Sequence, residues 1–182
     1  MTSTKFSNFD VVGWLNDYYS AGTNLNYDDL KPVLSFTLLW NLFESNTCEG
    51  KATLAGINTS VMKADGGGEL IFRNYEEYLD IFRTRYSQHP EEIDNLGLRP
   101  KEKDAVRALM GDSVVVSAST VVALLLIAKG VRNNFFHGNA PKQVDRLLGQ
   151  SQLFEVVNNL LADYMDNYNS IPPPVRHTTR RR

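Results

Sequence analysis

The chain has 182 residues, 42% of them hydrophobic and 22% charged, which suits one globular domain with a sizeable core. Cys48 is the only cysteine, so an intramolecular disulfide and a cysteine-based metal cluster are excluded, and the chain fits a reducing compartment. The net charge of −2 is unevenly distributed. Residues 175–182 hold four arginines and no acid, and the remaining 15 basic and 21 acidic residues give the body a charge of −6. Such a basic tail can contact phosphates, although a terminal arginine run is more often a solvated end.

No segment predicts export or a membrane span. Residues 1–8 are polar and lack the apolar core of a signal peptide. The longest apolar stretch, residues 114–128, includes three hydroxyl side chains and is too short to cross a bilayer, so we expect it in a buried helix. We therefore expect a cytoplasmic protein that has no membrane partner.

The first part of the chain predicts two amphipathic helices. Apolar residues at helical spacing predict a helix that begins near Phe9 and stops near Gly22. A second helix follows, with Asp28 and Asp29 near its N-terminus and Pro32 in its first turn. Its apolar stripe predicts a well-buried helix and consists of Val33, Phe36, Leu39, Trp40 and Phe43.

The middle of the chain, residues 47–99, has a weaker pattern, and we expect a loop-rich insertion with one helix there. Glycines at 50, 56 and 66–68 predict loops around at most a short helix at 52–63. One helix is indicated more clearly, because Asn74 and Glu77 have the spacing of a capping box and aromatic residues follow at helical spacing as far as Tyr86.

The C-terminal part predicts three more helices. Pro100 opens a helix that stops at Gly111, and an apolar helix follows over about 117–137, with Gly138 as its C-terminal cap. A final amphipathic helix is predicted over residues 143–168, and three prolines begin the tail, residues 171–182. Because no strand pattern is convincing, the predicted fold class is all-α. A single domain, residues 1–170, would form a bundle of about five main helices.

Residues 132–138 read Arg-Asn-Asn-Phe-Phe-His-Gly at the end of the apolar helix. A guanidinium and an imidazole five positions apart are unusual in such surroundings. Asn133 and His137 are four residues apart and share a helix face, and a long arginine can reach round to them. Arg132, Asn133 and His137 therefore form the candidate catalytic site, while Phe135 and Phe136 keep the other side of this turn hydrophobic.

These side chains suit chemistry on a phosphodiester. The C-terminal end of a helix favours the protonated form of His137, which can then both give and take protons. Arg132 stays protonated and can hold phosphate oxygens and stabilise negative charge in a transition state. RNA supplies its own nucleophile, the 2′-OH, so backbone cleavage requires neither a metal nor another cofactor.

A purely structural interpretation of the same residues stays open at this point. In it, Arg132 pairs with a carboxylate on a neighbouring helix, and His137 caps the last carbonyls of its own helix. Both are common structural devices, and spacing alone does not separate them from catalysis.

The string of residues 131–138 closely resembles the R-x4-6-H signature of HEPN domains. In that family a polar residue usually follows the arginine and a glycine often follows the histidine, and Asn133 and Gly138 match these two features. The aliphatic helix before the motif, the amphipathic helix after it and the aromatic-rich early helix also fit. The resemblance covers residues 8–46 and 100–168.

This resemblance implies a HEPN-like helical bundle that forms a homodimer and joins two motifs in one cleft. Many such proteins are metal-independent endoribonucleases that act as toxins or in anti-phage defence. On this chain Arg132 would bind the scissile phosphate, His137 would be the general acid and base, and Asn133 would orient the substrate or the histidine. Glu44 is the candidate for a cleft-lining residue from the early helix, although an ordinary ion pair between helices also accounts for it.

The implied partners are an RNA substrate, a second copy of the chain and an antitoxin or regulatory protein. Family toxins that a minimal nucleotidyltransferase antitoxin modifies often carry a tyrosine two residues after the histidine, where this chain has Asn139. That silencing mechanism is therefore not expected. The alternative function is a HEPN-type module that binds or senses a nucleotide or a partner without turnover.

Other residue groups give weaker signals. The glycines at 66–68 lack the Lys-Ser/Thr that completes a phosphate-binding loop. His89 with Glu91 and Glu92 lacks the helical spacing of a zinc site, so we expect a solvated helix cap. Trp40 falls on the buried stripe of its helix, and Cys48 has no histidine nearby in sequence to make it a nucleophile.

Overall fold

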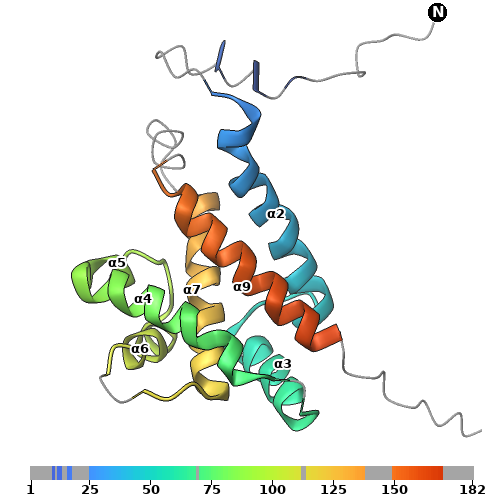
Figure 1. Cartoon of the computed structure of the whole chain (residues 1–182), viewed down its shortest axis with the longest axis vertical. Coiled ribbons are helices and arrows are strands. Elements are labelled where there is room, and N and C mark those ends of the chain that lie inside the picture. Colours follow the sequence, from blue (N-terminus) through green and yellow to red (C-terminus); the bar gives the residue numbers. More distant parts are fainter. Residues whose placement is uncertain are drawn as a thin grey trace, which may run out of the picture.

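The computed structural model describes residues 10, 12–13, 16–17, 25–68, 70–111, 114–137 and 149–169, with side chains as far as 135 and 168 in the last two ranges. Over these residues the fold is all-α, as the sequence predicts, and holds no strand (Figure 1). Its elements are α2 (Tyr27–Thr47), α3 (Leu54–Gly66), the 3₁₀ turn η2 (Phe72–Tyr75), α4 (Glu76–Gln88), α5 (Glu91–Asp94), α6 (Pro100–Ala108), α7 (Ala118–His137) and α9 (Ser151–Asn169).

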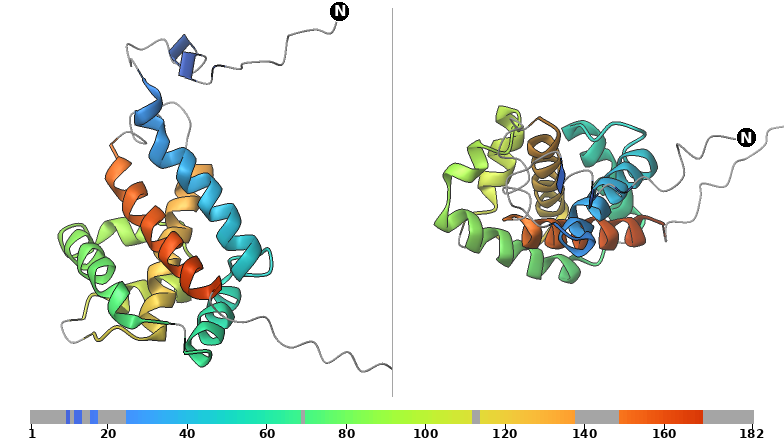
Figure 2. Two further views of the ribbon diagram at one scale, coloured as in Figure 1. Left: turned by 45° about the vertical axis from the view of Figure 1, so that its right-hand side comes forward. Right: turned by 90° about the horizontal axis from the view of Figure 1, so that it is seen from above.

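Helix α7 is the centre of the bundle. It packs against α3, α6 and α9, and each of its residues 121–128 is at most 5% exposed. Figures 1 and 2 show α9 crossing in front of α7, with α2 beside α9. Full burial explains why this segment is aliphatic on every side, because a polar side chain there would lose its hydration.

Helix α2 packs along α9 through aromatic rings. The ring centroids of Phe36 and Phe154 are 5.3 Å apart, and those of Phe43 and Tyr164 are 5.8 Å apart. These tilted and edge-on contacts are the arrangements that aromatic pairs prefer. The predicted stripe is confirmed, since four of its members are buried and one is partly buried: Val33, Phe36, Trp40 and Phe43, with Leu39.

Helix α2 begins one turn earlier than the sequence predicts. Asn26 accepts the N–H of Asp29, and Asp29 accepts the N–H of Asn26, so this capping box starts the helix at Tyr27. Pro32 therefore lies inside the helix rather than in its first turn. Its carbonyl accepts a hydrogen bond of 2.9 Å from Asn158 Nδ2, which ties α2 to α9 at this point.

The segment 47–99 is more helical than we expected, because it holds α3 and α4, of 13 residues each, and the short α5. Gly56 reads as a loop marker in the sequence but lies inside α3. A Cβ at that position would come within 2.6 Å of the Lys51 carbonyl oxygen, so close packing of the backbone requires glycine. Ile57 and Phe82 have no exposed surface, so this segment contributes to the same core as α7.

Other helix boundaries were predicted with varying success. The helix that opens at Pro100 is confirmed as α6. Helix α4 is also confirmed, but it begins at Glu76 after η2, so Asn74 is not its cap. The final helix begins at Ser151 rather than at 143, since residues 149–150 form a turn. Six of the described helices have nine or more residues, against about five expected.

Several predictions fall outside the described residues: most of the helix at 9–22, the cap at Gly138, residues 143–148 and the tail. Within the described ranges, no helix combines the length and the apolar character needed to cross a membrane.

Candidate active site

The predicted catalytic residues lie in the last turns of α7. Arg132, Asn133 and Phe135 are half-buried, in contrast to the fully buried residues 121–128 of the same helix. The ring of Phe135 packs edge-on against Phe154 of α9, with centroids 6.2 Å apart, so this side of the turn anchors the helix as expected. The side chain of His137 lies outside the described residues, as do that of Phe136 and the whole of Gly138.

A close contact fixes the loop between α5 and α6 against this part of α7. Gly130 allows it, because a Cβ there would lie 2.7 Å from the Cβ of Leu96. The next residue of the loop, Gly97, has φ +64°, a left-handed conformation that glycine adopts without strain. Its carbonyl accepts a hydrogen bond of 3.2 Å from Asn133 Nδ2. The amide of Asn133 is thereby oriented by the loop, with its oxygen left as an acceptor group.

Arg132 lies on a different side of α7 from Asn133. Successive residues of a helix are about 100° apart, so the two side chains leave the helix in different directions. His137 follows one turn after Asn133 on the same helix. The convergence of all three groups depends on the side chain of His137, and it stays a prediction.

Glu44 is not brought next to the motif within one chain. It lies near the C-terminal end of α2, where its Oε1 accepts the N–H of Ala52 at 3.0 Å and its backbone carbonyl accepts the N–H of Gly50 at 2.8 Å. Figure 1 shows that this end of α2 lies away from the C-terminal end of α7. This contact is neither part of a cleft at the motif nor an ion pair between helices, the two roles that the sequence suggested for Glu44. Glu44 closes the turn between α2 and α3.

A buried ion pair lies one turn before the motif. Lys129 Nζ of α7 is 2.5 Å from Glu102 Oε1 of α6, and the Glu102 side chain is 3% exposed. Burial opposes ionisation of Glu102, but the hydrogen bonds from Lys129 and from the Arg99 N–H outweigh it and lower the pKa of the carboxyl. The pair ties α6 to α7 and thus holds the loop that contacts Asn133.

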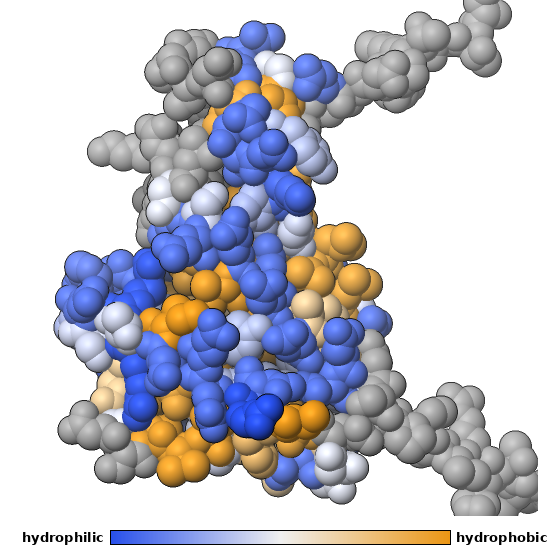
Figure 3. Space-filling model, in the orientation of Figure 1, coloured by the Kyte–Doolittle hydropathy of each residue, from blue (hydrophilic) through white to orange (hydrophobic). Residues whose placement is uncertain are grey.

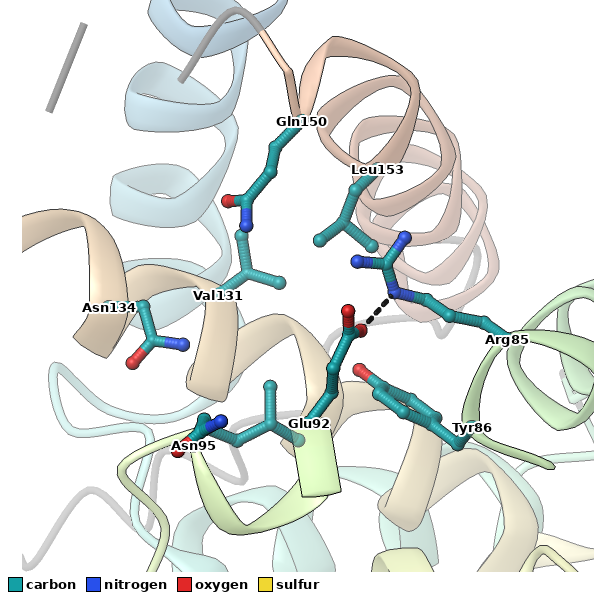
Figure 4. Close-up of a pocket in the computed structure, with 9 residues that line it drawn as sticks. Arg85, Tyr86, Glu92, Asn95, Val131, Asn134, Gln150 and Leu153 are labelled. Atoms are coloured by element: carbon teal, nitrogen blue, oxygen red, sulfur yellow. Dashed lines mark ion pairs between the residues drawn. The ribbon is translucent and has the colours of Figure 1, made fainter. Parts of the chain in front are cut away.

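A pocket opens beside the motif, and Figure 4 shows its wall. The cavity is about 260 Å³ and is formed where α4, α5, α7 and the start of α9 meet. Asn134, the second asparagine of the motif, belongs to this wall. Sequence reasoning singled out Asn133 and missed Asn134, although the paired asparagines were the available signal. The other lining residues are Arg85, Tyr86, Glu92, Asn95, Leu96, Val131, Gln150 and Leu153.

The weaker candidates have structural roles. His89 is the C-cap residue of α4, and its Nδ1 lies 3.5 Å from Glu91 Oε1, in agreement with a solvated cap. Trp40 is buried among Phe36 and Phe43, as predicted for a core residue. Cys48 is buried, and burial raises the pKa of its thiol, which disfavours the reactive thiolate.

Among the described residues, no group of three or more His, Cys, Asp or Glu side chains is arranged to hold a metal ion.

Comparison of the chain with protein-family models, with curated proteins and with solved structures finds no match.

Proposed function

We propose that the protein is a HEPN-type endoribonuclease in which Arg132 and His137 act on the RNA backbone without a metal, as a toxin or an anti-phage defence effector. The observation that carries the proposal is the motif of residues 132–138 at the end of a buried helix in an all-α bundle. Burial of residues 121–128 fixes the helix, and its half-buried last turns carry the polar side chains of Arg132 and Asn133.

The proposed reaction begins when His137 removes the proton of a ribose 2′-OH. The oxygen attacks the adjacent phosphorus, and Arg132 stabilises the charge on the phosphate oxygens. The bond from phosphorus to the 5′-oxygen breaks, and a protonated imidazole gives that oxygen its proton. The products are a 2′,3′-cyclic phosphate and a 5′-hydroxyl end. Asn133, held by Gly97, would accept a hydrogen bond from the ribose or the imidazole.

A second copy of the chain is part of the proposal, and the outer face of α2 offers a surface for it. Leu34, Leu38 and Leu42 are 42%, 62% and 41% exposed, and Figure 3 shows hydrophobic surface on this side of the molecule. Residues 32–43 hold no charged side chain, so this part of α2 carries apolar side chains on both its buried and its outer face. Leu34 and Leu42 are each four residues from Leu38, so this row of three exposed leucines is self-complementary. When a second copy of α2 lies antiparallel to the first, Leu42 of one chain lies against Leu34 of the other.

The proposed activity is tested by inducing the wild type, Arg132→Ala and His137→Ala in growing bacteria, then measuring growth and total RNA. The wild type is expected to arrest growth and to leave RNA fragments that end in a 2′,3′-cyclic phosphate, even when lysates are assayed with metal chelated. Both variants are expected to lose this effect. Glu44→Gln is the matched control, since Glu44 lies at the α2–α3 turn.

Intact RNA in wild-type cells, or equal cleavage by both alanine variants, would remove the nuclease proposal. Binding of RNA or nucleotides without cleavage would select the alternative, a binding or sensing module. The dimer is tested separately by light scattering, where the wild type is expected to have twice the chain mass and Leu38→Glu to be monomeric. A monomeric wild type would contradict the proposed partner.

A further inference from the structure

The pocket beside the motif has the size of a site for one ring system. At about 260 Å³ it falls just below the roughly 300–1,000 Å³ typical of sites for drug-sized molecules. Asn134 joins it to the motif, since positions 134 and 137 are three residues apart on α7 and share one side of the helix. A group bound in the pocket would therefore lie on the side of α7 that carries position 137.

The charges of the described lining residues favour a neutral ligand. Arg85 of α4 and Glu92 of α5 form an ion pair with Nε and Oε2 2.8 Å apart, drawn as a dashed line in Figure 4. The two charges cancel, so the pocket offers an isolated phosphate or carboxylate little net attraction. The remaining ionisable group of the described lining, the Tyr86 hydroxyl, is neutral at pH 7, and burial raises its pKa further.

Carboxamides supply most of the remaining polar groups. Asn95, Asn134 and Gln150 come from three different parts of the chain, and each offers an N–H₂ donor and a carbonyl acceptor. In Figure 4 the side chains of Asn134 and Gln150 extend towards the space between them. Val131 and Leu153 add apolar wall. Donors and acceptors at the edge with apolar surface beside them match a planar heterocycle that has polar edges and apolar faces.

We propose that this pocket binds one unpaired nucleobase and that Asn95, Asn134 and Gln150 read its edge. Proteins that recognise single-stranded RNA commonly bind splayed bases through such edge contacts. The identity of the ligand as a base of the RNA beside the scissile phosphate rests on the proposed function. The pocket would then set the nucleotide at which the chain cuts, while Arg132 and His137 supply the chemistry.

Two arms test this proposal on the full-length protein. In the first, binding of the four nucleoside 5′-monophosphates is measured by NMR titration. In the second, cleavage of an oligoribonucleotide pool is sequenced to give the base preference at the cut. Asn134→Asp is the key variant, because it replaces an amide donor by an acceptor at nearly the same size. Asn159→Asp, at an exposed position on α9, is the matched control.

We expect one base to be preferred in both arms. Asn134→Asp should change the ratio between the preferred base and its nearest competitor at least tenfold, in line with the cost of a mispaired edge contact. The control should leave that ratio unchanged, and thermal melts should show both variants folded. If wild type cuts RNA but Asn134→Asp and Gln150→Ala retain its base preference, the pocket is not the reader and the nuclease proposal stands. If wild type cuts nothing yet binds a nucleotide through Asn134, the base site stands and the nuclease proposal fails.

Discussion

The two ends of α7 differ in what surrounds them. Residues 121–128 are aliphatic and buried on every side, whereas residues 132–135 are half-buried and read Arg-Asn-Asn-Phe. One continuous helix thus changes from a structural element to a candidate site within about one turn, and Lys129 marks the transition with its ion pair to Glu102. A rigid, buried stretch can thus hold in place polar groups that contribute much less to stability than its own aliphatic side chains do. Substitutions at the two ends should therefore affect different properties.

The largest effect on stability is expected in the buried half. Leu125 has no exposed surface, so Leu125→Ala removes its packing and leaves a cavity. We expect the free energy of unfolding to fall by about 4 kcal/mol, within the range for buried leucines. Urea denaturation followed by circular dichroism measures it. A loss below about 1 kcal/mol would show that this part of α7 is not the centre of the core.

The ion pair at the transition is expected to come next. Lys129→Met leaves the buried carboxylate of Glu102 without its partner, which should cost about 3 kcal/mol at pH 7, towards the lower end for buried pairs because Lys129 is 17% exposed. Adding Glu102→Leu removes the orphaned charge and should recover much of the loss. If the single variant is as stable as the wild type, the pair does not hold α6 to α7.

The same carboxyl predicts a dependence of stability on pH. Because the pKa of Glu102 is lower in the folded protein than its ordinary value of about 4.5, its contribution is present in full above that value. The contribution is lost as the pH falls from there through the lower pKa of the folded state. Unfolding measured between pH 3 and 7 should show a steeper acid loss for the wild type than for the Lys129→Met, Glu102→Leu double variant. Identical slopes would contradict this assignment.

The smallest effect on stability is expected at the exposed end. Asn133→Ala removes one hydrogen bond of 3.2 Å to the Gly97 carbonyl, which should cost at most about 1 kcal/mol. Cleavage of RNA should fall by more than this loss of stability explains, because the amide also belongs to the proposed site. Equal activity of Asn133→Ala and wild type would assign Asn133 to the loop alone.

Much of the fold followed from periodic apolar residues. The stripe of α2 and the helix that opens at Pro100 were predictable because burial of one face imposes a 3.6-residue period. The long buried helix was predictable from its continuous apolar run. Helix α3 was underestimated because Gly56 resembles a loop residue in sequence. Only the fold reveals that the Lys51 carbonyl occupies the space of a side chain there.

The candidate site was predictable only in part. The order of residues 132–138 identifies the motif and its place at a helix end. The bond from Asn133 to Gly97 joins residues 36 positions apart, and the pocket at Asn134 needs four helices to meet. Such distant contacts depend on tertiary packing, which local spacing does not encode. Glu44 illustrates the same limit, because its partner at Ala52 is set by the turn after α2.

We propose that the end of α7 performs chemistry that the buried half of the helix only supports. The most direct test is the single-turnover rate of RNA cleavage by purified wild type and His137→Ala, with metal chelated and folded fractions matched by circular dichroism. We predict a rate about 10²- to 10⁴-fold lower for the variant, the usual range for loss of a general acid or base. A wild type that leaves RNA uncut, or a His137→Ala variant that cuts at the wild-type rate, would contradict the account.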